Sequence, residues 1–278
     1  MTDLPFQPPK AYKNSEFLNS PSARHIRILC EYEETRQRFL RYGIRDTLVF
    51  FGSARAVPDA VSAERLASAR DAVVRAPADE AAAAALHKAE ADQRLSRFYG
   101  DAQRLAYLLA EWSEQRAEGE RRYTITSGGG PGIMEAANRG ASEAGARTAG
   151  LGISLPFEQG VNGWVSPELA FEFHYFFTRK YWFLYPCRGL VIFPGGFGTL
   201  DELFETLTLV QTGKIKRRLP IVLFGTSYWD RVLDLDVMVE YGTISKKDLD
   251  LAHRTDDVDE AFVYLKGALL EAETLQAG

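Results

Sequence analysis

The chain alternates between short apolar runs and longer stretches in which apolar residues recur every three to four positions. The short runs are apolar at nearly every position, which predicts strands buried on both faces. They span residues 47–51, 122–126, 147–153, 171–176, 189–193 and 219–224. The longer stretches predict helices, with a break at Pro77. They cover residues 23–43, two helices within 59–118, 133–137, 178–186, a helix beginning just before Glu202, and 257–272.

Strands that alternate with helices predict an α/β fold, a Rossmann-like doubly wound parallel sheet with helices on both faces. Residues 1–43 are expected to form an N-terminal arm, extended and proline-dotted up to residue 22, followed by a surface helix. Residues 44–278 are expected to form a single Rossmann-like domain with a helical insertion at about 59–118. Ligands of such sheets bind at the carboxyl ends of the strands, near the point where the strand order reverses.

Composition and charge narrow the classes of partner. The 278 residues are 46% hydrophobic and 26% charged, as in ordinary globular proteins. The 33 Lys and Arg against 38 Asp and Glu give a net charge of −5, which argues against nucleic acid or an anionic membrane as a partner. No apolar stretch approaches the roughly 18 residues of a membrane span. The N-terminus has no signal-peptide pattern, and Cys30 and Cys187 are too few for a disulfide framework, so a cytoplasmic protein is expected.

Three glycine-bearing loops follow predicted strands, at residues 52–55, 127–132 and 194–199. Glycines let backbone N–H groups approach a phosphate, and a helix N-terminus favours its negative charge. The dinucleotide-binding fingerprint is not matched, because Ile133 stands where its third glycine would be needed. The Gly-x-x-x-x-Gly-Lys-Ser/Thr loop of triphosphatases is not matched either. The glycines alone also fit tight strand-to-helix turns. Two such turns in one sheet, the second with Thr199, favour a phosphate site.

Two further features stand near these loops. Glu202 lies one turn inside the helix after the third loop, where it serves either as a dipole-stabilising carboxylate or in catalysis. Arg179 and Lys180 place two cations at the start of a predicted helix, which is unfavourable unless an anion lies nearby; a solvated pair is the alternative. The four histidines have no zinc-ligand spacing, so no metal site is expected.

Together, the glycine loops, Thr178-Arg179-Lys180 and the Pro194–Glu202 motif resemble the Lonely Guy (LOG) family, in its longer bacterial branch. The resemblance runs from about Thr47 to Phe224 and implies a phosphoribohydrolase, of a family once labelled lysine decarboxylases. It implies that AMP, or a cytokinin riboside 5′-monophosphate, is hydrolysed to free base and ribose 5-phosphate without a cofactor. A homo-oligomer, dimer at least, is also implied.

The same resemblance assigns roles to individual residues. Arg179 and Glu202 form the implied catalytic pair. The implied substrate and phosphate contacts are Gly52, Ser53, Gly129, Gly130, Gly132, Glu158, Lys180, Gly195, Gly196, Gly198 and Thr199. Arginine does not deprotonate in proteins, so Arg179 is expected to position groups rather than donate a proton.

Two alternatives stay open. A non-catalytic nucleotide or molybdenum-cofactor carrier of the same fold would use the same loops. A lysine decarboxylase would require a lysine that binds pyridoxal phosphate, and nothing around Lys180 marks it as one.

Overall fold

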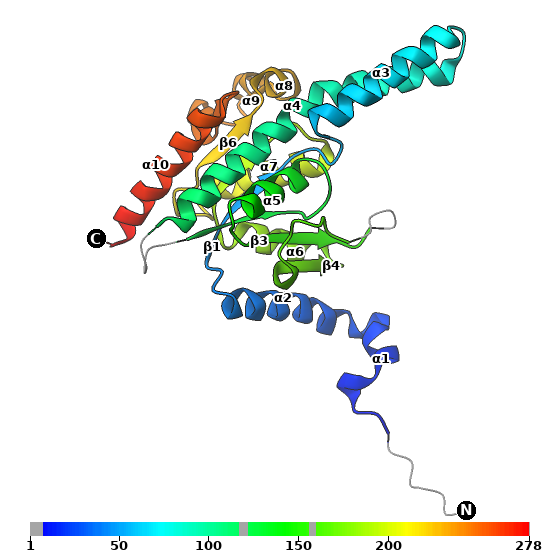
Figure 1. Cartoon of the computed structure of the whole chain (residues 1–278). Helices are drawn as coiled ribbons and strands as arrows, with labels where there is room; N and C mark the ends of the chain where they lie inside the picture. Colours follow the sequence, from blue (N-terminus) through cyan, green and yellow to red (C-terminus); the bar gives the residue numbers. More distant parts are fainter. Residues whose placement is uncertain (1–7, 117–121, 156–159, 278) are drawn as a thin grey trace, which may run out of the picture.

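The computed structural model describes residues 8–116, 122–155 and 160–277, and its centre is a seven-stranded sheet (Figure 1). The strands are β1 Asp46–Phe51, β2 Tyr123–Ser127, β3 Thr148–Ile153, β4 Ala170–Phe173, β5 Cys187–Ile192, β6 Ile221–Phe224 and β7 His253–Thr255. They lie in the order β4-β3-β2-β1-β5-β6-β7, and all neighbouring pairs are parallel. The strand order therefore reverses between β1 and β5, and the predicted doubly wound parallel sheet is confirmed.

Helices cover both faces of this sheet. The helices of the described residues are α1 Ser15–Asn19, α2 Arg24–Arg41, α3 Asp59–Arg75, α4 Glu80–Glu114, α5 Ile133–Glu143, α6 Phe176–Leu184, α7 Phe197–Gln211, α8 Thr226–Val232, α9 Leu235–Glu240 and α10 Val258–Ala277. Short 3-10 turns occur at η1 Ala11–Lys13, η2 Pro21–Ala23, η3 Pro167–Leu169 and η4 Lys246–Leu251. Among the described residues, no helix is both long and apolar enough to cross a membrane.

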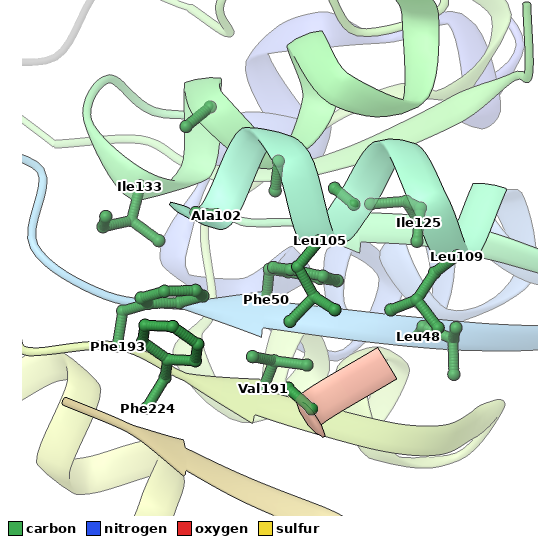
Figure 2. Close-up of a cluster of buried hydrophobic side chains, with 14 of the residues drawn as sticks. Leu48, Phe50, Ala102, Leu105, Leu109, Ile125, Ile133, Val191, Phe193 and Phe224 are labelled. Carbon is green, nitrogen blue, oxygen red and sulfur yellow. The ribbon is translucent and has the colours of Figure 1, made fainter. Parts of the chain in front are cut away.

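Alternate residues of β1 serve two separate cores, as the two-residue period of a strand requires. Leu48 and Phe50 lie in the core under α4, α5 and α10, where Figure 2 shows them beside leucines of α4. Val49 and Phe51 lie in the other core, with residues of α2, α6, α7 and α8. Burial on both faces explains why the central strands are apolar at every position.

Helices α3 and α4 pack on each other, and α3 with the first part of α4 projects beyond the sheet (Figure 1). The predicted break near Pro77 is confirmed, since α3 ends at Arg75 and α4 begins at Glu80. The Asp79 side chain accepts a hydrogen bond from the Ala81 N–H, which caps the start of α4.

The expected extended arm is wrong for the part that the structure describes. From residue 8 onward it contains η1, α1 and η2. The Asn14 side chain accepts a hydrogen bond from the Phe17 N–H at the start of α1, and Pro21 occupies the first position of η2, which suits its fixed φ. Residues 1–7 lie outside the described part.

The strand predicted over 171–176 is also wrong at its end. β4 stops at Phe173, and α6 begins at Phe176, two residues before the predicted helix start. The last helix likewise continues to Ala277, beyond the predicted end at 272. β7, α8 and α9 carry no apolar run long enough to predict them.

Candidate functional site

The three glycine-bearing loops meet at the carboxyl ends of β1, β2 and β5, where the strand order reverses. The loop after β1 connects the other two. The Ser53 N–H donates to the Pro194 carbonyl at 2.9 Å, and the Ile133 N–H donates to the Ser53 carbonyl at 3.1 Å. Gly52 packs tightly on Ile133, since a Cβ at residue 52 would lie 2.8 Å from that side chain. The structure thus brings the predicted loops into one place.

The loop between β2 and α5 depends on glycine at two positions. Gly129 and Gly132 both have φ of 73°, in the left-handed region that other residues rarely adopt. At Gly132 a Cβ would also overlap the Ser53 carbonyl oxygen and lie 2.7 Å from the carbonyl carbon of Ala54. Only glycine lets the start of α5 approach the β1 loop this closely.

This requirement can be tested with a matched pair of glycines. Gly132→Ala is expected to lower the free energy of unfolding by at least about 2 kcal/mol more than Gly145→Ala, because overpacking adds to the cost of a positive φ. Gly145 has a similar φ of 76°, but no atom lies within 4 Å of an added Cβ. Urea unfolding of both variants measures the difference, and equal losses would show that the close approach to Ser53 costs nothing.

Buried polar groups hold this loop from behind. The Ser127 hydroxyl accepts a hydrogen bond from the Gly129 N–H and lies 2.7 Å from Oδ1 of Asn138. The Asn162 side chain donates to the carbonyls of Gly129 and Gly130 at 3.0 and 3.1 Å. Because these carbonyls are engaged on the protein side, the shape of the loop is fixed before any ligand binds.

The third loop delivers the chain from β5 into α7. At Gly195, which is buried, a Cβ would lie 2.6 Å from the Thr199 Cβ. The Tyr228 hydroxyl donates to the Gly195 carbonyl at 2.6 Å and braces the turn. Gly196 and Gly198 are exposed, and no described side chain caps the N-terminus of α7. That N-terminus is consequently open to an anion.

Glu202 lies in the second turn of α7 and is only 5% exposed. Its Oε2 atom has no hydrogen-bond partner among the described residues. Burial raises the pKa of the carboxyl to about 7, although nearby Lys180 and Arg179 act in the opposite direction. A buried carboxylate without a full set of partners is costly, and such groups concentrate at functional sites.

Arg179 lies in α6 and contacts three elements of the site. Its Nε donates to the Leu151 carbonyl of β3 at 2.7 Å, and its guanidinium lies 5.0 Å from the centre of the Phe183 ring. A Cβ at Gly128 would lie 2.6 Å from its Nη2. Arg179 is therefore held against the glycine loop after β2, within electrostatic range of Glu202.

Lys180 has partners within the protein. Its Nζ forms ion pairs with Asp201 and Glu205 of α7, at 2.8 and 2.9 Å. Burial by itself would lower the pKa of Lys180, but the hydrogen bonds to these two carboxylates outweigh it and raise that pKa. The carboxylates are four residues apart and lie on one face of α7. Lys180 thereby joins α6 to the helix that carries Glu202.

A further carboxylate, which the sequence did not point to, lies at the start of α6. Glu31 of α2 accepts hydrogen bonds from the backbone immediately before α6. No local signal links Glu31 to residues more than 140 positions away.

The predicted contact Glu158 lies outside the described residues. Among those described, no cluster of His, Cys, Asp and Glu is suited to hold a metal ion.

Comparisons with known proteins give a family and several distant structures. Residues 134–265 match the sequence profile of a family described as "Possible lysine decarboxylase". No curated protein matches the chain.

Three solved structures are similar over most of the chain. The protein TM1055 is 19% identical, with a TM-score of 0.47, over 80% of this chain and 99% of its own. The molybdenum cofactor binding protein from the phototrophic bacterium Rippkaea orientalis is 16% identical, with a TM-score of 0.44, over 81% of this chain and 98% of its own. A Moco carrier protein from Chlamydomonas reinhardtii is 18% identical, with a TM-score of 0.43, over 82% of this chain and 99% of its own.

Proposed function

We propose that the chain is a member of the Lonely Guy family and hydrolyses the N-glycosidic bond of a purine nucleoside 5′-monophosphate, with AMP as the first candidate. The match of residues 134–265 to the family described as "Possible lysine decarboxylase" supports this proposal. The observation that carries the proposal is Glu202, a buried carboxylate with an unpartnered oxygen, in the helix whose N-terminus follows the glycine turn. In this proposal the Glu202 carboxylate lies near the anomeric carbon of the ribose while the glycine turn binds the 5′-phosphate.

The proposed reaction needs a negative charge near the ribose. Breaking the bond to the base builds oxocarbenium character at the anomeric carbon, which the Glu202 carboxylate stabilises while it orients the attacking water. The water oxygen bonds to the anomeric carbon and one of its protons is released. The bonding electrons leave with the base nitrogen, which takes up a proton.

The remaining groups orient the substrate in this proposal. The 5′-phosphate lies at the open N-terminus of α7, near Gly196 and Gly198, and its binding energy helps to place the anomeric carbon at Glu202. Arg179, held by Leu151 and Phe183, supports the departing base or the phosphate. The loops after β1 and β2 line the other side of the proposed substrate site, through Gly52, Ser53, Gly129, Gly130 and Gly132.

The other two readings predict different observations. A carrier would bind a nucleotide or molybdenum cofactor and leave it unreacted, so the ligand would co-purify with the protein. A decarboxylase needs a lysine that becomes a neutral amine, whereas Asp201 and Glu205 raise the pKa of Lys180 and hold it charged.

A panel of purine and pyrimidine 5′-monophosphates tests the proposed function. Release of free base from AMP, followed by chromatography, is the expected result, with cytokinin riboside 5′-monophosphates included as competing substrates. Adenosine, which lacks the phosphate, is expected to react far more slowly, because it forgoes the binding energy at α7. Intact nucleotides after long incubation with ample protein would overturn the proposal.

The raised pKa of Glu202 sets the pH dependence of this activity. If the charged carboxylate acts in the reaction, kcat/KM for AMP is expected to fall about tenfold per pH unit below the pKa of about 7, and to level off above it. A phosphate monoester titrates near pH 6, so KM is measured at each pH as a control. A rate that instead climbs as the pH drops below 7 would assign Glu202 the role of a proton donor.

We also propose a homo-oligomer, because large aromatic side chains are exposed around the site. Phe197 at the start of α7 is 92% exposed, and Phe176 and Phe177 at the start of α6 are also exposed. Exposed aromatic residues gathered on one face are typical of protein interfaces.

A further inference from the structure

Glu31 lies on α2, the helix that precedes the sheet, yet its carboxylate contacts the start of α6. Oε1 accepts a hydrogen bond from the His174 N–H at 2.8 Å, and Oε2 accepts one from the Tyr175 N–H at 3.4 Å. The Thr178 hydroxyl donates to Oε2 at 2.5 Å. One carboxylate thus engages two backbone groups and one side chain at the point where β4 turns into α6.

This start of α6 lacks the usual local stabilisation. The side chain of its N-cap residue, Tyr175, makes no capping hydrogen bond, and its first turn contains no acidic residue. Arg179 and Lys180 follow in the second turn and add positive charge to the positive end of the helix dipole. Glu31 supplies from another helix the acceptor and the negative charge that an N-cap aspartate would supply locally.

Helix α2 is firmly seated, so Glu31 is held at a fixed place. Arg38 donates to the Ala170 carbonyl of β4 at 2.6 Å, and its guanidinium lies 4.1 Å from the centre of the Phe171 ring. Tyr32, next to Glu31, packs against Trp182 of α6 with ring centres 5.5 Å apart. These contacts make α2 a rigid support for the beginning of α6.

Fixing this turn fixes Arg179. Thr178, which donates to Glu31, directly precedes it, and the Arg179 N–H donates to the Tyr175 carbonyl at 3.3 Å. The Arg179 Nε must meet the Leu151 carbonyl at 2.7 Å, a distance that a shifted or frayed first turn would not preserve. Glu31 therefore acts on the site through the backbone that carries Arg179.

We propose that Glu31 of the N-terminal helix is a positioning residue for Arg179, so that α2 is part of the machinery of the site. The proposal rests on the proposed function only for its kinetic consequence. In this proposal α2, which precedes the first strand, holds the start of α6 in the geometry that the reaction requires.

Glu31→Gln and Glu31→Ala test this role. Losing a cap that is worth about 1 kcal/mol corresponds to about a fivefold effect, so we expect Glu31→Gln to lower kcat for AMP about fivefold and Glu31→Ala to lower it further. KM is expected to stay within threefold. Hydrogen exchange of the backbone amides over 174–179 is expected to accelerate in both variants.

Glu33→Gln is the matched control, because Glu33 lies on the same helix, is half exposed and pairs only with Arg36 among the described residues. We expect it to leave both kcat and exchange over 174–179 unchanged. In an Arg179→Lys background, Glu31→Gln is expected to cost less than twofold in kcat, because the residue through which it acts is already altered. A merely structural role would give the same loss in both backgrounds.

Wild-type kcat in Glu31→Gln, or unchanged exchange over 174–179, would overturn the proposal. Equal losses in the two backgrounds would do the same. If the wild-type chain released no base from any nucleoside monophosphate, the proposed function would fail, and the exchange measurement would still decide whether Glu31 fixes the start of α6.

Discussion

Glu202→Gln is expected to lower kcat/KM for AMP on the order of 10³-fold, because the amide keeps the shape of the side chain but removes its charge. The carboxyl is 5% exposed and its Oε2 has no hydrogen-bond partner in the described part of the chain, so no protein donor already engages that oxygen. Steady-state release of adenine at pH 8 measures the loss. Activity within tenfold of wild type would remove Glu202 from the reaction.

The same substitution is expected to stabilise the fold at alkaline pH. Burial raises the pKa of Glu202 to about 7, from the 4.5 of a free side chain, so the folded state favours the protonated form. The stability that the folded state gains by keeping the Glu202 carboxyl protonated is fully present below about pH 4.5 and is lost as the pH rises through 7. At pH 8, Glu202→Gln should therefore unfold with a free energy higher than wild type by on the order of 3 kcal/mol.

A control separates this effect from general loss of negative charge. Glu143→Gln removes an exposed carboxylate at the far end of α5, where it pairs with Arg139. It is expected to keep wild-type activity and to gain no stability at pH 8. Urea unfolding at pH 5 and pH 8 distinguishes the two variants. A Glu202→Gln gain that did not depend on pH would contradict the raised pKa.

Arg179→Lys is expected to lower kcat/KM about 10²-fold, the second-largest effect. Lysine retains the charge but lacks the planar fork and the Nε that meets the Leu151 carbonyl at 2.7 Å. It also loses the flat contact with the Phe183 ring. The same steady-state assay measures the loss, which should fall mainly on kcat if Arg179 acts on the departing base.

Arg188→Lys is the matched control for this change. Arg188 pairs with Asp46 at the amino ends of β5 and β1, the edge of the sheet opposite the glycine loops. Its replacement is expected to leave kcat/KM within about threefold of wild type, because lysine keeps the positive charge beside Asp46 and the pair lies away from the candidate site. An Arg179→Lys variant as active as this control would show that charge alone suffices at residue 179.

The sheet could be predicted from sequence because its signal is local. Strands such as β1 and β5 are buried on both faces by two layers of helices, so nearly every position must be apolar. β7 is the counterexample. It lies at the sheet edge, spans only His253–Thr255, and two of its three residues are partly exposed, so it leaves no apolar run to recognise.

The candidate site could be predicted from sequence only where a single segment carries several of its groups. The motif Pro194–Glu202 holds the turn, the helix start and the carboxylate together. What the sequence could not show is which groups from distant segments complete it. Glu31 of α2 accepts a hydrogen bond from the backbone before α6, and Lys180 forms ion pairs with Asp201 and Glu205 of α7. These contacts depend on packing between elements, and no periodicity within one element encodes them.

The identity of the products tests the central claim most directly. AMP incubated with the purified wild-type chain is followed by phosphorus NMR and chromatography in the same sample. We expect adenine and ribose 5-phosphate in equal amounts, with no inorganic phosphate. AMP that stays intact while bound, or its conversion to adenosine and phosphate, would contradict hydrolysis at the glycosidic bond.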